Sequence, residues 1–153
     1  MADGTTESTW GFRPIASGEW AGWSTYGEYG HEPFEDHAGP FYARLDENGQ
    51  VVCGFRADAH HMNGSGFMHG GALMTFADFS IFVIAREALT GHGSVTASMN
   101  CEFVDAGREG ELIECRGEVV RAGASMVFVR GIISTDGRPL LNFSSIIKKL
   151  RRR

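Results

Sequence analysis

The fold of this chain is decided by residues 66–90, GFMHGGALMTFADFSIFVIAREALT. From position 70 onward, apolar side chains recur at steps of three and four residues, which is the spacing of one face of an α-helix. The residues in this repeat are Leu73, Phe76, Ala77, Ile81, Ile84, Ala85 and Leu89, and a second apolar set covers most of the other side with Met74, Phe79, Phe82 and Val83. The spacing predicts a helix over residues 70–90 that is buried on nearly every side and ends at Gly91 and Gly93.

The segments on both sides of this helix have the character of β-strands. Residues 41–57, FYARLDENGQVVCGFRA, form two β-prone runs around Asn48-Gly49, a pair that supplies the positive φ angles of a tight hairpin turn. Four further runs of strand length follow the helix: SVTASMNCEFVD, ELIECRGEVVRAG, ASMVFVRGIISTD and RPLLNFSSIIKKL. Their links are too short for parallel crossovers, so we expect an antiparallel sheet in an α+β fold that wraps around the central helix.

Strict alternation in the first of these runs divides its side chains between the two faces of the predicted strand. It puts Val95, Ala97, Met99, Cys101 and Phe103 on one face, and Thr96, Ser98, Asn100 and Glu102 on the other.

The chain of 153 residues is about one domain long, and its composition changes at both ends. Residues 1–9 are small and polar and are expected to be disordered. Residues 10–40 are rich in aromatic residues and glycine without a clear period, which indicates loops and a short helix that either cap the core or cover an apolar ligand. Residues 41–150 are the main domain, and residues 148–153 are a basic tail, which is either solvated or in contact with phosphate.

Composition and charge exclude several classes of protein. The chain is 42% hydrophobic and 22% charged, as in an ordinary globular protein, and its formal net charge of -5 argues against a surface built for nucleic acid. No apolar run reaches the length of a signal peptide or a membrane span. The three cysteines are odd in number and widely spaced, which favours free core thiols. We therefore predict a cytoplasmic protein that binds neither nucleic acid nor membrane.

The start of the predicted helix is suited to binding a carbonyl oxygen. A helix N-terminus offers unpaired backbone N–H groups, and Gly70-Gly71 removes the side chains that would keep a ligand away from them. His69 at the mouth can donate a hydrogen bond to the same oxygen or hold the loop. Asp78, two turns into an apolar helix, is costly unless paired or functional, and is a candidate base for water or a nucleophile.

These residues resemble a known family. The run Asn63-x-x-Gly66-x-x-His69-Gly70-Gly71, followed by Asp78, is similar to the motif of hot-dog-fold acyl-CoA thioesterases of the phenylacetate-pathway (PaaI-like) type. The resemblance covers roughly residues 40–148 and implies the hot-dog fold for the main domain, with an antiparallel sheet wrapped around one long central helix.

The resemblance also implies roles for single residues. Asp78 matches the catalytic carboxylate, and Gly70 matches the glycine whose N–H polarises the thioester carbonyl. His69 and Asn63 match residues that position the thioester and the water, and Thr96 matches a hydroxyl residue that assists the carboxylate. Gly66 and Gly71 fall at the motif's other glycines, where we expect substrate binding.

In the family, the active site forms across a dimer interface, so the resemblance implies a homodimer or homotetramer that takes acyl-CoA and needs no cofactor. Arg or Lys side chains are the natural partners of the coenzyme A phosphates, and the candidates are the basic tail with Arg121, Arg130 and Arg138.

Other interpretations remain open from the sequence. A hydratase or dehydratase of acyl thioesters also needs an acid and a base near a polarised carbonyl, for which His69 and Asp78 are suitable, and a non-catalytic acyl-CoA-binding module is a further alternative. A metal site at His60, His61 and His69 is disfavoured because their spacing matches no known ligand pattern. Nucleophilic Cys–His chemistry is disfavoured because all three cysteines fall in predicted strands, where a buried thiol is normally inert.

Overall fold

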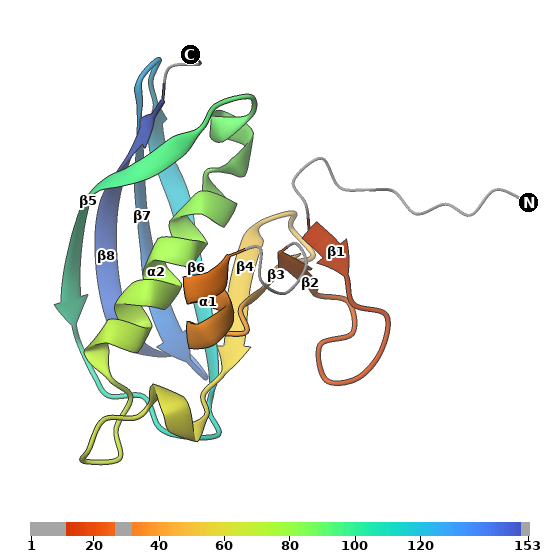
Figure 1. The fold of residues 1–153 in the computed structure, drawn as a ribbon, viewed down its shortest axis with the longest axis vertical. Coiled ribbons are helices and arrows are strands. Elements are labelled where there is room, and N and C mark those ends of the chain that lie inside the picture. Colours follow the sequence, from red (N-terminus) through yellow and green to blue (C-terminus); the bar gives the residue numbers. More distant parts are fainter. Residues whose placement is uncertain (1–11, 27–31, 151–153) are drawn as a thin grey trace, which may run out of the picture.

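Within residues 12–26 and 32–150, which the computed structural model describes, eight strands form one antiparallel sheet, and helix α2 lies across one of its faces (Figure 1). The strand order is β1-β2-β3-β4-β6-β7-β8-β5. The elements are β1 (Phe12–Pro14), β2 (Ser24–Tyr26), α1 (Pro33–Ala38), β3 (Tyr42–Leu45), β4 (Val51–Arg56), the 3₁₀ turn η1 (Ala59–His61), α2 (Gly70–Ile84), the 3₁₀ turn η2 (Arg86–Leu89), β5 (Ser94–Phe103), β6 (Leu112–Ala122), β7 (Met126–Thr135) and β8 (Arg138–Lys149). The α+β class and the antiparallel sheet around one long helix are confirmed.

Two tight turns follow directly from local sequence. In the β3–β4 hairpin, the Asp46 carboxylate accepts hydrogen bonds from the N–H groups of Asn48 and Gln50, both at 2.9 Å, and Gly49 has a φ of +74°. Between β7 and β8, Asp136 and Gly137 both have positive φ, at 46° and 76°, as a two-residue hairpin turn requires. The hairpin predicted at residues 41–57 is confirmed by the antiparallel pairing of β3 with β4.

Helix α2 buries one broad side against the sheet. Its buried side chains are Leu73, Phe76, Ala77, Phe79, Ser80, Ile81 and Val83. The other side is more open than the apolar spacing predicted, because Met74 is 41% exposed and Thr75 and Asp78 are half-buried. The helix also ends at Ile84, six residues earlier than predicted. The Arg86 guanidinium donates to the Val83 carbonyl at 3.3 Å, and the chain continues as the separate turn η2.

The core between α2 and the sheet is built on aromatic rings and two thiols. The rings of Phe55 and Phe76 meet edge to face with their centroids 4.7 Å apart. Cys53 and Cys115 face each other on paired strands and are fully buried free thiols. Burial raises the pKa of Cys115 to about 12, so at neutral pH this thiol is protonated and is no nucleophile.

A β-bulge in β5 changes which of its side chains face the helix. The pairing of β5 with β8 shifts register between Thr96 and Ser98. Ser94 and Thr96 point inward before the shift, and Met99 and Cys101 point inward after it. The predicted strict alternation is therefore wrong, because the bulge inserts one residue and lets Thr96 share a face with Met99.

The aromatic-rich segment is more regular than the sequence indicated. Strands β1 and β2 extend the sheet beyond β3, and the Trp20 ring stacks on Tyr42 with centroids 4.1 Å apart. Helix α1 lies beside α2. The predictions for residues 1–9 and for Arg151–Arg153 of the basic tail lie outside the described residues. Among the described helices, none combines the length and the apolar character that crossing a bilayer requires.

Candidate active site

Asp78 is paired with a hydroxyl from the edge strand. The Thr96 side chain donates a hydrogen bond to the Asp78 carboxylate at 2.5 Å, and both residues are half-buried. The bond holds one carboxylate oxygen, and it depends on the β5 bulge, which turns Thr96 toward α2. The two residues are 18 positions apart, and the structure brings them together as the resemblance implied.

A cleft of about 560 Å³ opens beside this pair. Its apolar wall comes from five elements, and its side chains are Phe12, Tyr26, Phe79, Phe82, Val83, Leu89 and Val95. Polar groups complete the lining, among them Glu32, Glu35, Arg86 and His92. An apolar cleft with a few polar groups next to a carboxylate is the form of a small-molecule site. Phe12 and Tyr26 come from the aromatic-rich segment, so part of this segment lines the cleft.

Glu35 on α1 is a second carboxylate in this cleft, and its pKa is perturbed. Burial is the first cause, and the charges of Glu32, Asp78 and Asp36 add to it, so the pKa of Glu35 is raised to about 7. Sequence reasoning missed this residue. The sequence around Glu35, PFEDHAGP, contains an acidic pair but no periodicity and no known motif. The position of Glu35 beside Asp78 depends on how α1 packs against α2.

The start of α2 offers one free backbone amide. The Nδ1 atom of His69 accepts a hydrogen bond from the Gly71 N–H at 2.9 Å, which caps the helix. Within the described residues, the Gly70 N–H has no hydrogen-bond partner. The expectation that both glycine amides stay open therefore needs correction at Gly71. Since Nδ1 of His69 accepts, its Nε2 carries the ring proton and is available as a donor.

The loop before the helix is built on Asn63. Its side-chain oxygen accepts hydrogen bonds from Ser65 N–H at 2.9 Å and Phe67 N–H at 3.2 Å, and Gly66 adopts a φ of +78° in the same turn. The Asn63 side-chain NH₂ group donates no hydrogen bond within the described part of the chain. Asn63, Gly66 and His69 are thus brought together around the exposed start of α2.

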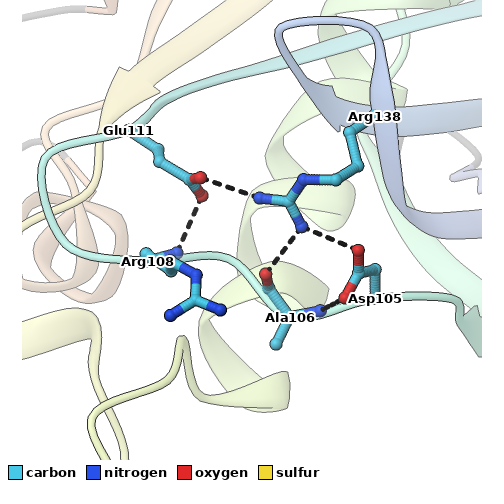
Figure 2. Close-up of polar contacts among 5 residues, drawn as sticks. All are labelled: Asp105, Ala106, Arg108, Glu111 and Arg138. Atoms are coloured by element: carbon cyan, nitrogen blue, oxygen red, sulfur yellow. Dashed lines mark hydrogen bonds and ion pairs between the residues drawn. The ribbon is translucent and has the colours of Figure 1, made fainter.

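A network around Arg138 braces the segment behind this loop (Figure 2). The guanidinium donates to Asp105 at 2.8 Å, to the Ala106 carbonyl at 3.0 Å and to Glu111 at 2.7 Å. The braced β5–β6 connection in turn contacts the helix start, because the Gly107 carbonyl accepts a hydrogen bond from Met68 N–H at 2.8 Å. A side chain at position 107 would lie 3.1 Å from Met68, so the two segments are in close contact.

Two of the arginines considered for coenzyme A phosphates are already paired with carboxylates. Arg138 is held by Asp105 and Glu111, and Arg130 forms an ion pair with Glu118. Arg121 makes no ion pair within residues 12–26 and 32–150.

The histidines considered for a metal site are not gathered into one. Among the described residues, no group of three His, Cys, Asp or Glu side chains is placed to hold a metal ion. His60 and His61 instead contact the end of α1. The Nε2 atom of His61 lies 2.7 Å from the Ala38 carbonyl, and that of His60 lies 3.2 Å from the Gly39 carbonyl.

The two parts of the predicted site are separated along α2. Gly70 and Asp78 are eight residues apart, which is about 12 Å along a helix that rises about 1.5 Å per residue. The free N–H groups of a helix start also point away from the helix, so an oxygen bound to Gly70 lies roughly 3 Å further from Asp78. Within one chain, the amide and the carboxylate are therefore too far apart to act on one carbonyl group.

Comparisons with known proteins agree with this fold. Residues 65–141 match the model of the thioesterase superfamily. The chain is 30% identical over 115 residues to the Pseudomonas aeruginosa protein PA0474, which is named as an esterase, and the match covers 74% of this chain and 86% of that protein.

Solved structures show the same fold at lower identity. The PaaI protein of the phenylacetic acid degradation operon of E. coli matches with a TM-score of 0.68 and 18% identity, over 80% of this chain and 88% of that one. A hypothetical thioesterase from Streptococcus pneumoniae, solved with coenzyme A, matches with a TM-score of 0.63 and 23% identity, over 74% of this chain and 88% of that one. The chain therefore belongs to the thioesterase superfamily, and it is a thioester hydrolase with the hot-dog fold.

Proposed function

We propose that this chain hydrolyses acyl-CoA thioesters to the free acid and coenzyme A, in an active site formed jointly by two copies of the chain. The observation that carries the proposal is the Asp78–Thr96 pair at the mouth of an apolar cleft. The coenzyme A bound to the similar pneumococcal thioesterase supports the choice of substrate. An aspartate and a threonine were each replaced by alanine in variant structures of that protein, and these are the same residue types as this pair.

Each half of the site has a defined role in this proposal. The Gly70 N–H donates to the thioester oxygen and stabilises the negative charge that develops there, as an oxyanion hole does. The Nε2–H of His69 and the side-chain NH₂ of Asn63 position the thioester and the attacking water. Asp78 takes a proton from that water or attacks the carbonyl carbon itself, and Thr96 fixes the direction of its carboxylate.

The separation of Gly70 from Asp78 supports a site shared between two copies. Strand β5 is the last strand of the sheet in the described chain, and its free edge lies beside the open side of α2. Apolar side chains remain exposed at this end of the sheet, including Val95 at 45% and Phe103 at 55%. A long unpaired edge with exposed apolar side chains is a natural place for a second copy to join. Pairing there brings Gly70 of one subunit toward Asp78 of the other.

The cleft beside Asp78 is the proposed acyl site. Its aromatic and aliphatic wall suits either an aromatic acyl group or an aliphatic chain of medium length, because about 560 Å³ exceeds the volume of both. The free, directly opposed thiols of Cys53 and Cys115 support the cytoplasmic location expected for this reaction.

The decisive test is thiol release from a panel of aryl- and alkyl-acyl-CoAs. We expect the wild type to turn over at least one member, and Asp78→Asn and Asp78→Ala to lose roughly a hundredfold or more in kcat while remaining folded. Glu47→Gln is a matched control, since Glu47 is an exposed carboxylate in the β3–β4 turn. Binding of acyl-CoA without thiol release from any member would contradict the proposal.

A further inference from the structure

Glu35 and the Asp78–Thr96 pair line the same two cavities. Four residues, Glu32, Glu35, Asp78 and Thr96, line both the 560 Å³ cleft and a neighbouring hollow of about 420 Å³. Glu35 thus lies where the two spaces join, next to the proposed base. We propose that Glu35 is a positioning residue that acts through Asp78, and that its negative charge favours the transfer of a water proton to Asp78. The proposal rests on the proposed function with Asp78 acting as a general base.

Helix α1 is fastened in a way that keeps Glu35 in this position. The His61 ring accepts a hydrogen bond from Asp58 N–H at 2.9 Å through Nδ1, so its Nε2–H donates to the Ala38 carbonyl, 2.7 Å away. His60 lies 3.2 Å from the next carbonyl, that of Gly39. The last turn of α1 is therefore tied to the main domain, and its first turn carries Glu35, which lines the cleft together with Asp78 of α2.

The charged groups around Glu35 are mostly of its own sign. Its surroundings contain Tyr26 on β2, Glu32 and Asp36 near or on α1, Asp78 on α2, and Arg86 and His92 further along the cleft. Arg86 is directed elsewhere, because it donates to the Val83 carbonyl and forms an ion pair with Glu87 at 3.6 Å. Within the described residues, no cation forms an ion pair with Glu35.

These surroundings place the ionisation of Glu35 in the neutral range. Burial, followed by the charges of Glu32, Asp78 and Asp36, raises the pKa of Glu35 to about 7. Glu35 is therefore protonated and neutral in mildly acidic solution, and it becomes negatively charged as the pH rises past about 7.

The chemical consequence follows from the direction of proton transfer. In the attack step, the water proton passes to Asp78, the water oxygen bonds to the carbonyl carbon, and the carbonyl π electrons move to the oxygen. The carbonyl then re-forms as the C–S bond breaks, and the leaving sulfur takes up the proton held by Asp78, which returns to its charged form. Asp78 becomes neutral in the first step, so a negative charge on Glu35 favours that step by stabilising the protonated form of Asp78.

The experiment is a pH profile of acyl-CoA hydrolysis between pH 5.5 and 8.5 for the wild type and Glu35→Gln. In the wild type, we expect kcat to rise several-fold through pH 7, because the ionised Glu35 stabilises the protonated form of Asp78 that the attack step produces. Glu35→Gln should lack the rise and stay at the low-pH rate, with KM changed less than about twofold.

Two controls separate this effect from a general change in charge. Glu32→Gln removes a carboxylate from the same cleft but leaves Glu35, so the rise should remain and move to lower pH. Glu47→Gln, in the exposed β3–β4 turn, should superimpose on the wild type.

Three results would overturn the proposal. The first is a rise through pH 7 that persists in Glu35→Gln, and the second is a wild-type rate that falls as Glu35 ionises. The third is the absence of thiol release from the wild type at every pH, which refutes the proposed function itself. An active wild type with an unchanged Glu35→Gln profile refutes the role of Glu35 alone.

Discussion

Two inactive variants of this protein should restore activity when they share one dimer. Gly70→Pro removes the proposed oxyanion donor, and Asp78→Asn removes the proposed base. If Gly70 of one subunit works with Asp78 of the other, a mixed dimer has one site with both defects and one intact site. A mixed dimer should therefore have about half of the wild-type activity, whereas each variant alone should lose roughly 100- to 1000-fold, the usual cost of one oxyanion donor or of the base.

The geometry of the helix start makes Gly70→Pro a clean perturbation. Gly70 is the first residue of α2, a position that proline favours because its N–H is unpaired there. His69 has φ of -66° and ψ of 133°, which is the extended conformation that a following proline requires. A Cβ at position 70 would lie 3.0 Å from the ring of Phe103, so this ring has to move slightly in any variant that adds a Cβ. Gly70→Ala has the same Cβ and keeps the N–H, so it measures the steric effect of the Cβ alone and should lose less activity than Gly70→Pro.

The assay is thiol release by dimers that carry two different affinity tags, purified on both so that only mixed dimers are measured. Random pairing without this selection gives half mixed dimers, and about a quarter of the wild-type activity. If the doubly purified mixed dimers are no more active than the single variants, the shared site is refuted. Doubly tagged mixed dimers of Gly70→Ala and Asp78→Asn are the control. They should have about half of the wild-type activity, because the Gly70 N–H of the Asp78→Asn subunit and Asp78 of the Gly70→Ala subunit form one intact site.

Three further predictions concern groups around the site. Thr96→Val removes the hydroxyl that donates to Asp78 at 2.5 Å, so kcat should fall about tenfold or more while Thr96→Ser retains most of it, as steady-state kinetics can check. Arg138→Met breaks the network behind Met68 and should lower both kcat/KM and the Tm, whereas Arg130→Met breaks an exposed ion pair on the same sheet and should change neither measurably. The pKa of Glu35 is raised from 4.5 to about 7, so its contribution to stability is full below pH 4.5 and is lost as the pH rises to about 7. Denaturant titration at pH 8 should therefore find Glu35→Gln more stable than the wild type by about 1–2 kcal/mol, a value reduced for partial exposure, and no such gain at pH 4.5.

Local sequence was sufficient for the elements and for the motif. The apolar spacing after Gly70, the Asn48-Gly49 turn and the strand-length runs each act over a few residues, so the helix, the hairpin and the antiparallel sheet could be predicted. The spacing of His69, Gly70 and Asp78 could also be compared with a known motif, because one helix fixes their separation. The end of the helix was misjudged, because the apolar spacing continues to Leu89 although the backbone changes to a 3₁₀ turn at Arg86.

The chemistry around these residues was decided by contacts between distant segments. Thr96 faces Asp78 only because a bulge interrupts β5, and strict alternation cannot show a bulge. Glu35 reaches the cleft because His60 and His61 hold α1 against the domain, more than 20 residues away in the chain. The sequence by itself determined a helix that carries a donor at its start and a carboxylate two turns later. Only the tertiary structure decided what lies beside that carboxylate, Thr96 from β5 and Glu35 from α1, because a helix fixes the spacing of residues along its axis while packing between distant segments decides what lies opposite each of them.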